Sequence, residues 1–76
     1  MNIRKETKKI IKNVANKPID FKEKILLSSI EILTIVAELE KKFGIIIDDK
    51  KIFREIFLNY ETLFEYIENS LYYKGS

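Results

Sequence analysis

Hydrophobic residues recur at helical spacing in three long segments of the chain and in one short segment. In the first, residues 2–16, apolar and small side chains fall on one side of the predicted helix and lysines on the opposite side. Pro18 disfavours helix at the residue before it, so this helix is expected to stop at residues 16–17 and to be followed by a loop over 17–28. The inward set is Ile3, Thr7, Ile10, Ile11 and Val14, and the outward set is Lys5, Lys8, Lys9 and Lys12.

The second helix is predicted to begin at two adjacent serines, Ser28 and Ser29. Ser28 and Glu31 have the spacing of a capping box, in which the serine oxygen accepts a backbone N–H and the glutamate reaches back to the cap. The helix is expected to end at Gly44, because glycine suits the left-handed conformation of a helix end. Its apolar stripe consists of Ile32, Ile35, Val36, Leu39 and Phe43.

The C-terminal half is expected to supply a crossing segment and two more helices. Residues 45–47, three isoleucines, would suggest a strand, but no other segment offers a partner, so a buried crossing is predicted. Residues 48–58 predict a short third helix from the spacing of Ile52, Phe53, Ile56 and Phe57. Thr62 and Glu65 have capping-box spacing and are predicted to open the last helix, while residues 72–76 are expected to fray. The inward positions of that helix are Leu63, Tyr66, Ile67 and Leu71.

The predicted fold class is therefore all-α, a small four-helix bundle with three longer helices and a short third one, forming a single domain over residues 1–76. The chain has neither cysteine nor histidine, which excludes disulfides and thiolate metal sites and removes the commonest general base. A chain this short also has little room for a water-excluding pocket. We expect a protein on which enzymes act, not an enzyme.

Charge is unevenly distributed along the chain. Residues 1–24 carry eight lysines and arginines against three acidic residues, whereas residues 25–76 carry six against nine. The basic character thus belongs to the N-terminal third. No apolar run has the length of a signal peptide or a membrane span, so a cytoplasmic location is expected.

Four segments of the sequence resemble parts of acyl carrier proteins. Residues 21–31, FKEKILLSSIE, resemble the family segment F-x-E-D-L-G-x-D-S-L-D, and residues 30–43, IEILTIVAELEKKF, look like its second helix, L-D-x-V-E-L-x-x-x-L-E-E-x-F. KKII at 8–11 and NYETL at 59–63 are similar to short motifs in the first and last helices of the family. The resemblance therefore covers nearly the whole chain. It implies a bundle of acyl-carrier type. In that family the serine before Leu or Ile carries a covalent 4′-phosphopantetheine group taken from coenzyme A, and here that position is Ser29.

The resemblance also implies a function and partners. The chain would hold an acyl or aminoacyl group as a thioester and pass it between enzymes of fatty-acid, polyketide or related biosynthesis. Its partners would be a phosphopantetheinyl transferase, which supplies the base and magnesium, and acyl- or aminoacyl-transferring synthases and ligases. The chain would work as a monomer without a metal of its own. Ser28 is expected to serve as the helix cap, and the candidate partner contacts are Ile30, Glu31, Leu33, Ala37 and Glu38.

The chain also departs from the family pattern. Ser28 stands where the family has aspartate, Leu26 where it has glycine, the first loop is shorter and the chain is less acidic. Serine and aspartate both cap helices well, so the fold should tolerate this change. Loss of the negative charge beside the attachment serine is expected to slow loading or to select a dedicated transferase.

Three other readings stay open from the residues alone. The lysine stripe of the first helix is a feature of surfaces that bind nucleic acid or anionic membranes. The chain has only two arginines, however, and no aromatic residue lies among those lysines in the sequence, so neither partner is expected. Alternatively, the bundle has the carrier fold but is never modified, in a structural or regulatory role. A third alternative concerns the apolar candidates for partner contact. If a bundle this small needs every apolar side chain in its core, Ile30, Leu33 and Ala37 are core residues instead.

Overall fold

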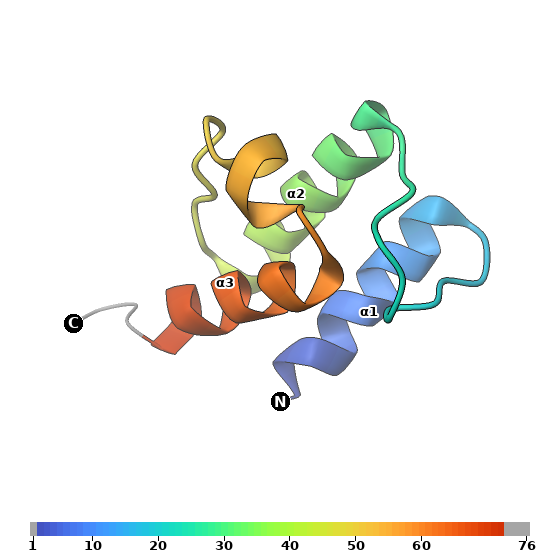
Figure 1. The fold of residues 1–76 in the computed structure, drawn as a ribbon. Coiled ribbons are helices and arrows are strands. Elements are labelled where there is room, and N and C mark those ends of the chain that lie inside the picture. The colour runs from blue at the N-terminus through green and yellow to red at the C-terminus, as the bar shows by residue number, and fades with distance from the viewer. Residues whose placement is uncertain (1, 73–76) are drawn as a thin grey trace.

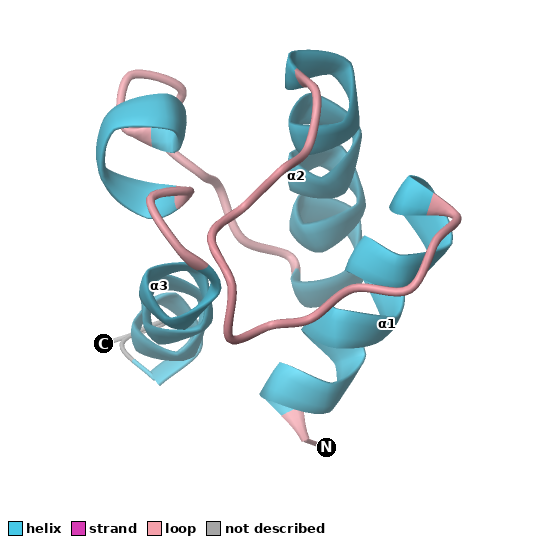
Figure 2. Ribbon diagram, turned by 45° about the vertical axis from the view of Figure 1, so that its right-hand side comes forward, coloured by secondary structure: helices cyan, strands magenta, loops and turns pink. Residues whose placement is uncertain are grey.

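Four helical segments joined by loops make up the computed structural model, which describes residues 2–72 (Figures 1 and 2). They are α1 (Ile3–Ala15), α2 (Ser29–Phe43), the π-helical turn η1 (Ile52–Ile56) and α3 (Tyr60–Tyr72). Within the described range there is no β-strand. The predicted all-helical bundle with a short third element is thus confirmed. Of the tail expected to fray, residues 73–76 lie outside the described residues.

Helix α1 contacts both α2 and α3, and η1 packs against α3. The loop over residues 16–28 runs back from the end of α1 and passes between α1 and α3 before it reaches α2 (Figure 2). This path brings Phe21, eight residues before the predicted attachment serine, into contact with α1 and α3. None of the helices over residues 2–72 has the length and apolarity that crossing a membrane requires.

Local signals fix the ends of α1 and α2. Asn2 caps α1, its side-chain oxygen accepting the N–H of Lys5 at 3.1 Å. Asn16 ends the helix in the left-handed conformation with φ 54°, as predicted for the stop before Pro18. Gly44 ends α2 in the same conformation with φ 64° and donates its N–H to the carbonyl of Glu40 at 2.8 Å.

The core is built mainly from the predicted stripes of α1, α2 and α3. Thr7 is fully buried among apolar side chains, and its hydroxyl donates to the carbonyl of Ile3 at 2.8 Å, so no polar group is left unpaired there. Two aromatic residues of α3 outside the predicted inward set, Tyr60 and Phe64, are also buried. The side chains in this core that are 0–1% exposed are Thr7, Ile11, Ile35, Leu39, Ile52, Ile56, Leu63 and Ile67.

The predicted start of the last helix was wrong. Helix α3 begins at Tyr60, and Asn59 caps it, its side-chain oxygen accepting the N–H of Thr62 at 2.8 Å and the Thr62 hydroxyl at 3.0 Å. Asparagine is as good a cap as threonine, and the earlier start allows Tyr60 to be buried as part of the helix. The expected box between Thr62 and Glu65 therefore does not form.

The predicted third helix is a single turn closed by hydrogen bonds between residues five apart. The N–H of Ile56 donates to Lys51 and that of Phe57 to Ile52, both at 2.9 Å. Such a turn places residues four and five apart on one side. Ile52, Ile56 and Phe57 accordingly enter the core, and Phe53 stays half exposed.

The crossing segment over residues 45–47 is only partly buried. Ile45 and Ile47 are buried, whereas Ile46 is 89% exposed. Side chains of an extended segment point alternately to opposite sides, which explains why the middle isoleucine faces solvent. The prediction of a buried crossing thus holds for two of the three residues.

Candidate functional site

The start of α2 holds the two adjacent serines in different roles. Ser28 is the N-cap, with extended backbone angles (φ −70°, ψ 162°), and its Oγ accepts the N–H of Glu31 at 3.2 Å. The Glu31 carboxylate accepts the N–H of Ser28 in return at 2.9 Å, which completes the predicted capping box. Ser29 is the first residue of the helix, and its side chain is exposed. Of the two serines, only Ser28 therefore takes part in the cap.

The hydroxyl of Ser29 is not used by the fold. It has no hydrogen-bond partner among residues 2–72, and neither do the backbone N–H groups of Ser29 and Ile30. Free amides in the first turn, together with the helix dipole, favour a negative charge at this end of a helix. The site thus combines an unpaired hydroxyl on an exposed residue with a local preference for an anion.

Electrostatics at this helix start involve Glu31, Lys17 and Tyr60. The Ser28 backbone N–H, which donates to the carboxylate, lowers the pKa of Glu31, and the positive charge of Lys17 adds to this shift. Burial raises the pKa of Tyr60, with a further contribution from the Glu31 carboxylate. Lys17 of the loop and Tyr60 of α3 lie near the start of α2, where they line a common hollow with Leu26.

Apolar side chains lie exposed beside Ser29 on α2. Ile30 is 77% exposed, Leu33 is 49% exposed, and Ala37 is also exposed, so the reading of these three residues as core is wrong. At 3.6 residues per turn they fall within an arc of about 60° that borders Ser29. Leu26, which stands where the family has glycine and was not among the predicted contacts, is 64% exposed three residues before Ser29.

Two of the three carboxylates of α2 are already hydrogen-bonded within the fold. Glu31 is engaged in the capping box. Glu40 accepts the N–H of Ile47 at 2.8 Å and thereby fixes the segment that follows the helix. Glu38 is exposed but lines a shallow hollow with Ile10 and Val14, at the seam with α1. The structure therefore groups the apolar candidates with Ser29 and places Glu38 apart from them.

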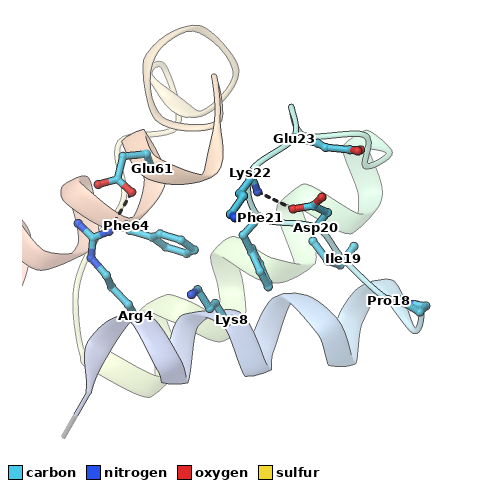
Figure 3. Close-up of a pocket in the computed structure, with 10 residues that line it drawn as sticks. All are labelled: Arg4, Lys8, Pro18, Ile19, Asp20, Phe21, Lys22, Glu23, Glu61 and Phe64. Atoms are coloured by element: carbon cyan, nitrogen blue, oxygen red, sulfur yellow. Dashed lines mark hydrogen bonds and ion pairs between the residues drawn. The ribbon is translucent and has the colours of Figure 1, made fainter.

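A second cluster forms where α1, the loop and α3 meet (Figure 3). The Lys8 ammonium lies 5.4 Å from the ring centroid of Phe21 and 5.6 Å from that of Phe64, and Lys12 lies 5.7 Å from Phe21. Phe21 also meets the ring of Tyr60 edge-on at 5.0 Å. Cations over ring faces are attracted by the aromatic quadrupole, so these contacts pin the loop to both helices.

This cluster corrects two sequence-based expectations. Lys8 was predicted to lie on an outward, solvated face, yet it is only partly exposed because the two rings cover it. Aromatic residues do lie among the lysines, since the loop and α3 bring Phe21 and Phe64 to α1. Phe64 could have been found from the 60, 63, 64, 67 spacing of α3, but the late predicted start of that helix hid the pattern.

Arg4 links α1 to α3 at the edge of this cluster. Its guanidinium donates to Glu61 at 2.8 Å and to Glu68 at 2.8 and 3.0 Å, and it lies 5.6 Å from the ring centroid of Phe64. The hydrogen bonds that Arg4 donates to Glu68 and, to a lesser degree, to Glu61 raise the pKa of Arg4, and the same contact with Arg4 lowers the pKa of Glu61. An open hollow of about 800 Å³ lies between these groups and the loop (Figure 3).

Within residues 2–72, no group of three or more acidic, histidine or cysteine side chains is placed to hold a metal ion. The chain has no significant match among protein-family models, curated proteins or solved structures.

Proposed function

We propose that this chain is an acyl carrier protein that holds an acyl or aminoacyl group as a thioester on a 4′-phosphopantetheine arm attached to Ser29. The resemblance of residues 21–43 to the family supports this proposal. The observation that carries it is the division of roles at the start of α2: Ser28 makes the cap, and the exposed Ser29 hydroxyl makes no hydrogen bond. A group added at Ser29 would therefore break no interaction of the fold.

The surroundings of Ser29 suit a phosphodiester. The free amides of Ser29 and Ile30 and the positive end of the α2 dipole would hold its negative charge. An anion at an exposed helix start is stabilised by about 0.3–1 kcal/mol. Lys17, whose positive charge is felt by Glu31, adds to the favourable potential.

The chain itself would contribute a nucleophile and a position. Ser29 Oγ attacks the β-phosphorus of coenzyme A, the new O–P bond forms as the P–O bond to 3′,5′-ADP breaks, and the transferase takes the serine proton. When bound, the arm supplies a flexible thiol, which raises the local concentration of the cargo at a partner enzyme. We propose that this work takes place in the cytoplasm and that the chain acts as a monomer.

The exposed apolar side chains beside Ser29 are the proposed contact surface for the transferase and for acyl-transferring enzymes. Ile30, Leu33 and Ala37 form this surface on α2, and Leu26 extends it onto the loop. Glu31 is expected to contribute less than family resemblance implies because its carboxylate is already hydrogen-bonded within the cap. Glu38 would contact only partners that also reach α1.

The test is to incubate the purified protein with coenzyme A, Mg²⁺ and a broad-specificity phosphopantetheinyl transferase and to measure its intact mass. One added phosphopantetheine unit is expected for the wild type and for Ser28→Asp, which retains a cap, and none for Ser29→Ala. Modification that persists in Ser29→Ala would place the site elsewhere. If no transferase modifies the wild type, the proposal is wrong and the unmodified bundle becomes the better reading.

A further inference from the structure

The lysine face of α1 has no part in the proposed function. It consists of Lys5, Lys8, Lys9 and Lys12, whose spacing of three and four residues places them on one side of the helix. All but the partly covered Lys8 are exposed, and within residues 2–72 no carboxylate forms an ion pair with any of the four. With Asn2 and Arg4 they line an open groove of about 430 Å³ that no acidic or apolar side chain borders.

Carboxylates limit the extent of this positive surface. Arg4, at its edge, is paired with Glu61 and Glu68 of α3. The neighbouring hollow, which shares Arg4 and Lys8 with the groove, is also lined by Asp20, Glu23 and Glu61. From residue 5 to residue 12 the face is about 10 Å long. A long polyanion that extends towards α3 and the loop would meet these carboxylates, whereas a compact acidic patch would not.

Nucleic acid and membrane are poorer matches to the same surface. The Phe64 ring is buried, and cations of α1 cover both Phe21 and Phe64, so neither ring is free to stack on a base. Arg4, the arginine on this side, already pairs with Glu61 and Glu68, so its guanidinium has no free pair of N–H groups for bidentate binding of a phosphate. The exposed large apolar side chains over residues 2–72, which would anchor a helix in lipid, all lie outside α1.

We infer that the lysine face of α1 docks a compact acidic patch on a partner protein, with carboxylates spaced as on one face of a helix. The spacing of Lys5, Lys9 and Lys12 matches glutamates placed three and four residues apart on a facing helix. Exposed ion pairs of this kind are individually weak, so the contact would be transient and salt-sensitive. The inference is independent of whether Ser29 is modified.

The test uses the full-length ¹⁵N-labelled protein and a synthetic helical peptide with four glutamates at this spacing. At low salt the peptide is expected to shift the amide signals of residues 5–12, and high salt should reverse the shifts. The double variant K5Q/K9Q should bind about fivefold more weakly, since two exposed ion pairs are lost. The matched control K41Q/K42Q removes the same charge from exposed positions of α2 and should bind like the wild type. Lys8 and Lys12 are kept in both because they contact the rings.

Any one of the following results would overturn the inference. Amide shifts spread over the molecule and not over α1, or equal weakening in the two double variants, would show that only net charge matters. Tighter binding of a DNA duplex of matched charge, or of phosphatidylglycerol vesicles, than of the peptide would assign the face to phosphate surfaces instead. An unchanged dissociation constant for K5Q/K9Q would show that Lys5 and Lys9 do not bind the peptide.

Discussion

Replacing Ser28 with alanine is expected to lower the free energy of unfolding, whereas the same change at Ser29 is not. Ser28→Ala removes the 3.2 Å hydrogen bond from the Glu31 N–H to the serine oxygen. The reciprocal 2.9 Å bond survives because its donor is the backbone of residue 28. Loss of one N-cap side chain destabilises a helix start by about 1 kcal/mol. Ser29 makes no comparable bond, and alanine is the better helix former, so Ser29→Ala should be neutral or slightly stabilising.

Thermal unfolding followed by circular dichroism measures this difference directly. For a domain of this size, about 1 kcal/mol corresponds to a fall in Tm of roughly 4–8 °C, which is expected for Ser28→Ala only. Ser28→Asp restores a capping oxygen and should keep the wild-type Tm. A loss of stability in Ser29→Ala as large as in Ser28→Ala would refute the assignment of the cap. It would also remove the argument that Ser29 is free for modification.

Three further predictions concern the core, the end of α2 and acid. Leu39→Ala should lower the free energy of unfolding by about 2–5 kcal/mol, because the side chain is fully buried. A urea titration that gives the variant the same free energy of unfolding as the wild type would contradict the burial of Leu39 in the core. Gly44→Ala should cost about 1–2 kcal/mol because φ is 64°, and an unchanged melting curve would argue against the left-handed end. The lowered pKa values of Glu31 and Glu61 stabilise the fold above the unfolded-state pKa, about 4.3, and this contribution should disappear as the pH falls through the lower folded-state values. Arg4→Gln should make the free energy of unfolding, measured by urea titration, fall less between neutral and acid pH. An equally large fall in this variant would show that the contact between Arg4 and Glu61 does not contribute to the pH dependence.

Local chemistry in the sequence was enough to predict the first two long helices. Pro18 and the left-handed Asn16 end α1, and Gly44 ends α2, through interactions that span only a few residues. The same local logic failed at α3 because two good caps, Asn59 and Thr62, stand three residues apart. Burial of the Tyr60 ring against the Phe21 ring, a contact between distant parts of the chain, accompanies the earlier start.

The surroundings of the lysines could not be predicted for the same reason. Helical periodicity describes one element at a time and placed Lys8 on a solvated face. In the folded chain its neighbours are Phe21, thirteen positions away, and Phe64, on another helix. Nothing in the spacing along α1 indicates that the loop folds back over it. Contacts of this kind follow from tertiary packing.

The distinction between the two serines, in contrast, is already present in the sequence, in the position of Glu31. A capping box requires Glu or Gln three residues after the cap, and the residue three positions after Ser29 is Ile32, which is needed in the core. Glu31 therefore selects Ser28 as the cap, and the helix then begins at Ser29 with its hydroxyl unpaired. If Glu31 were replaced by alanine, Ser28 Oγ could still accept the N–H of residue 31, and only the reciprocal bond would be lost. The Ser29 hydroxyl is thus free because the cap falls on Ser28 and the helix begins one residue later. The strength of any single hydrogen bond in the cap matters less.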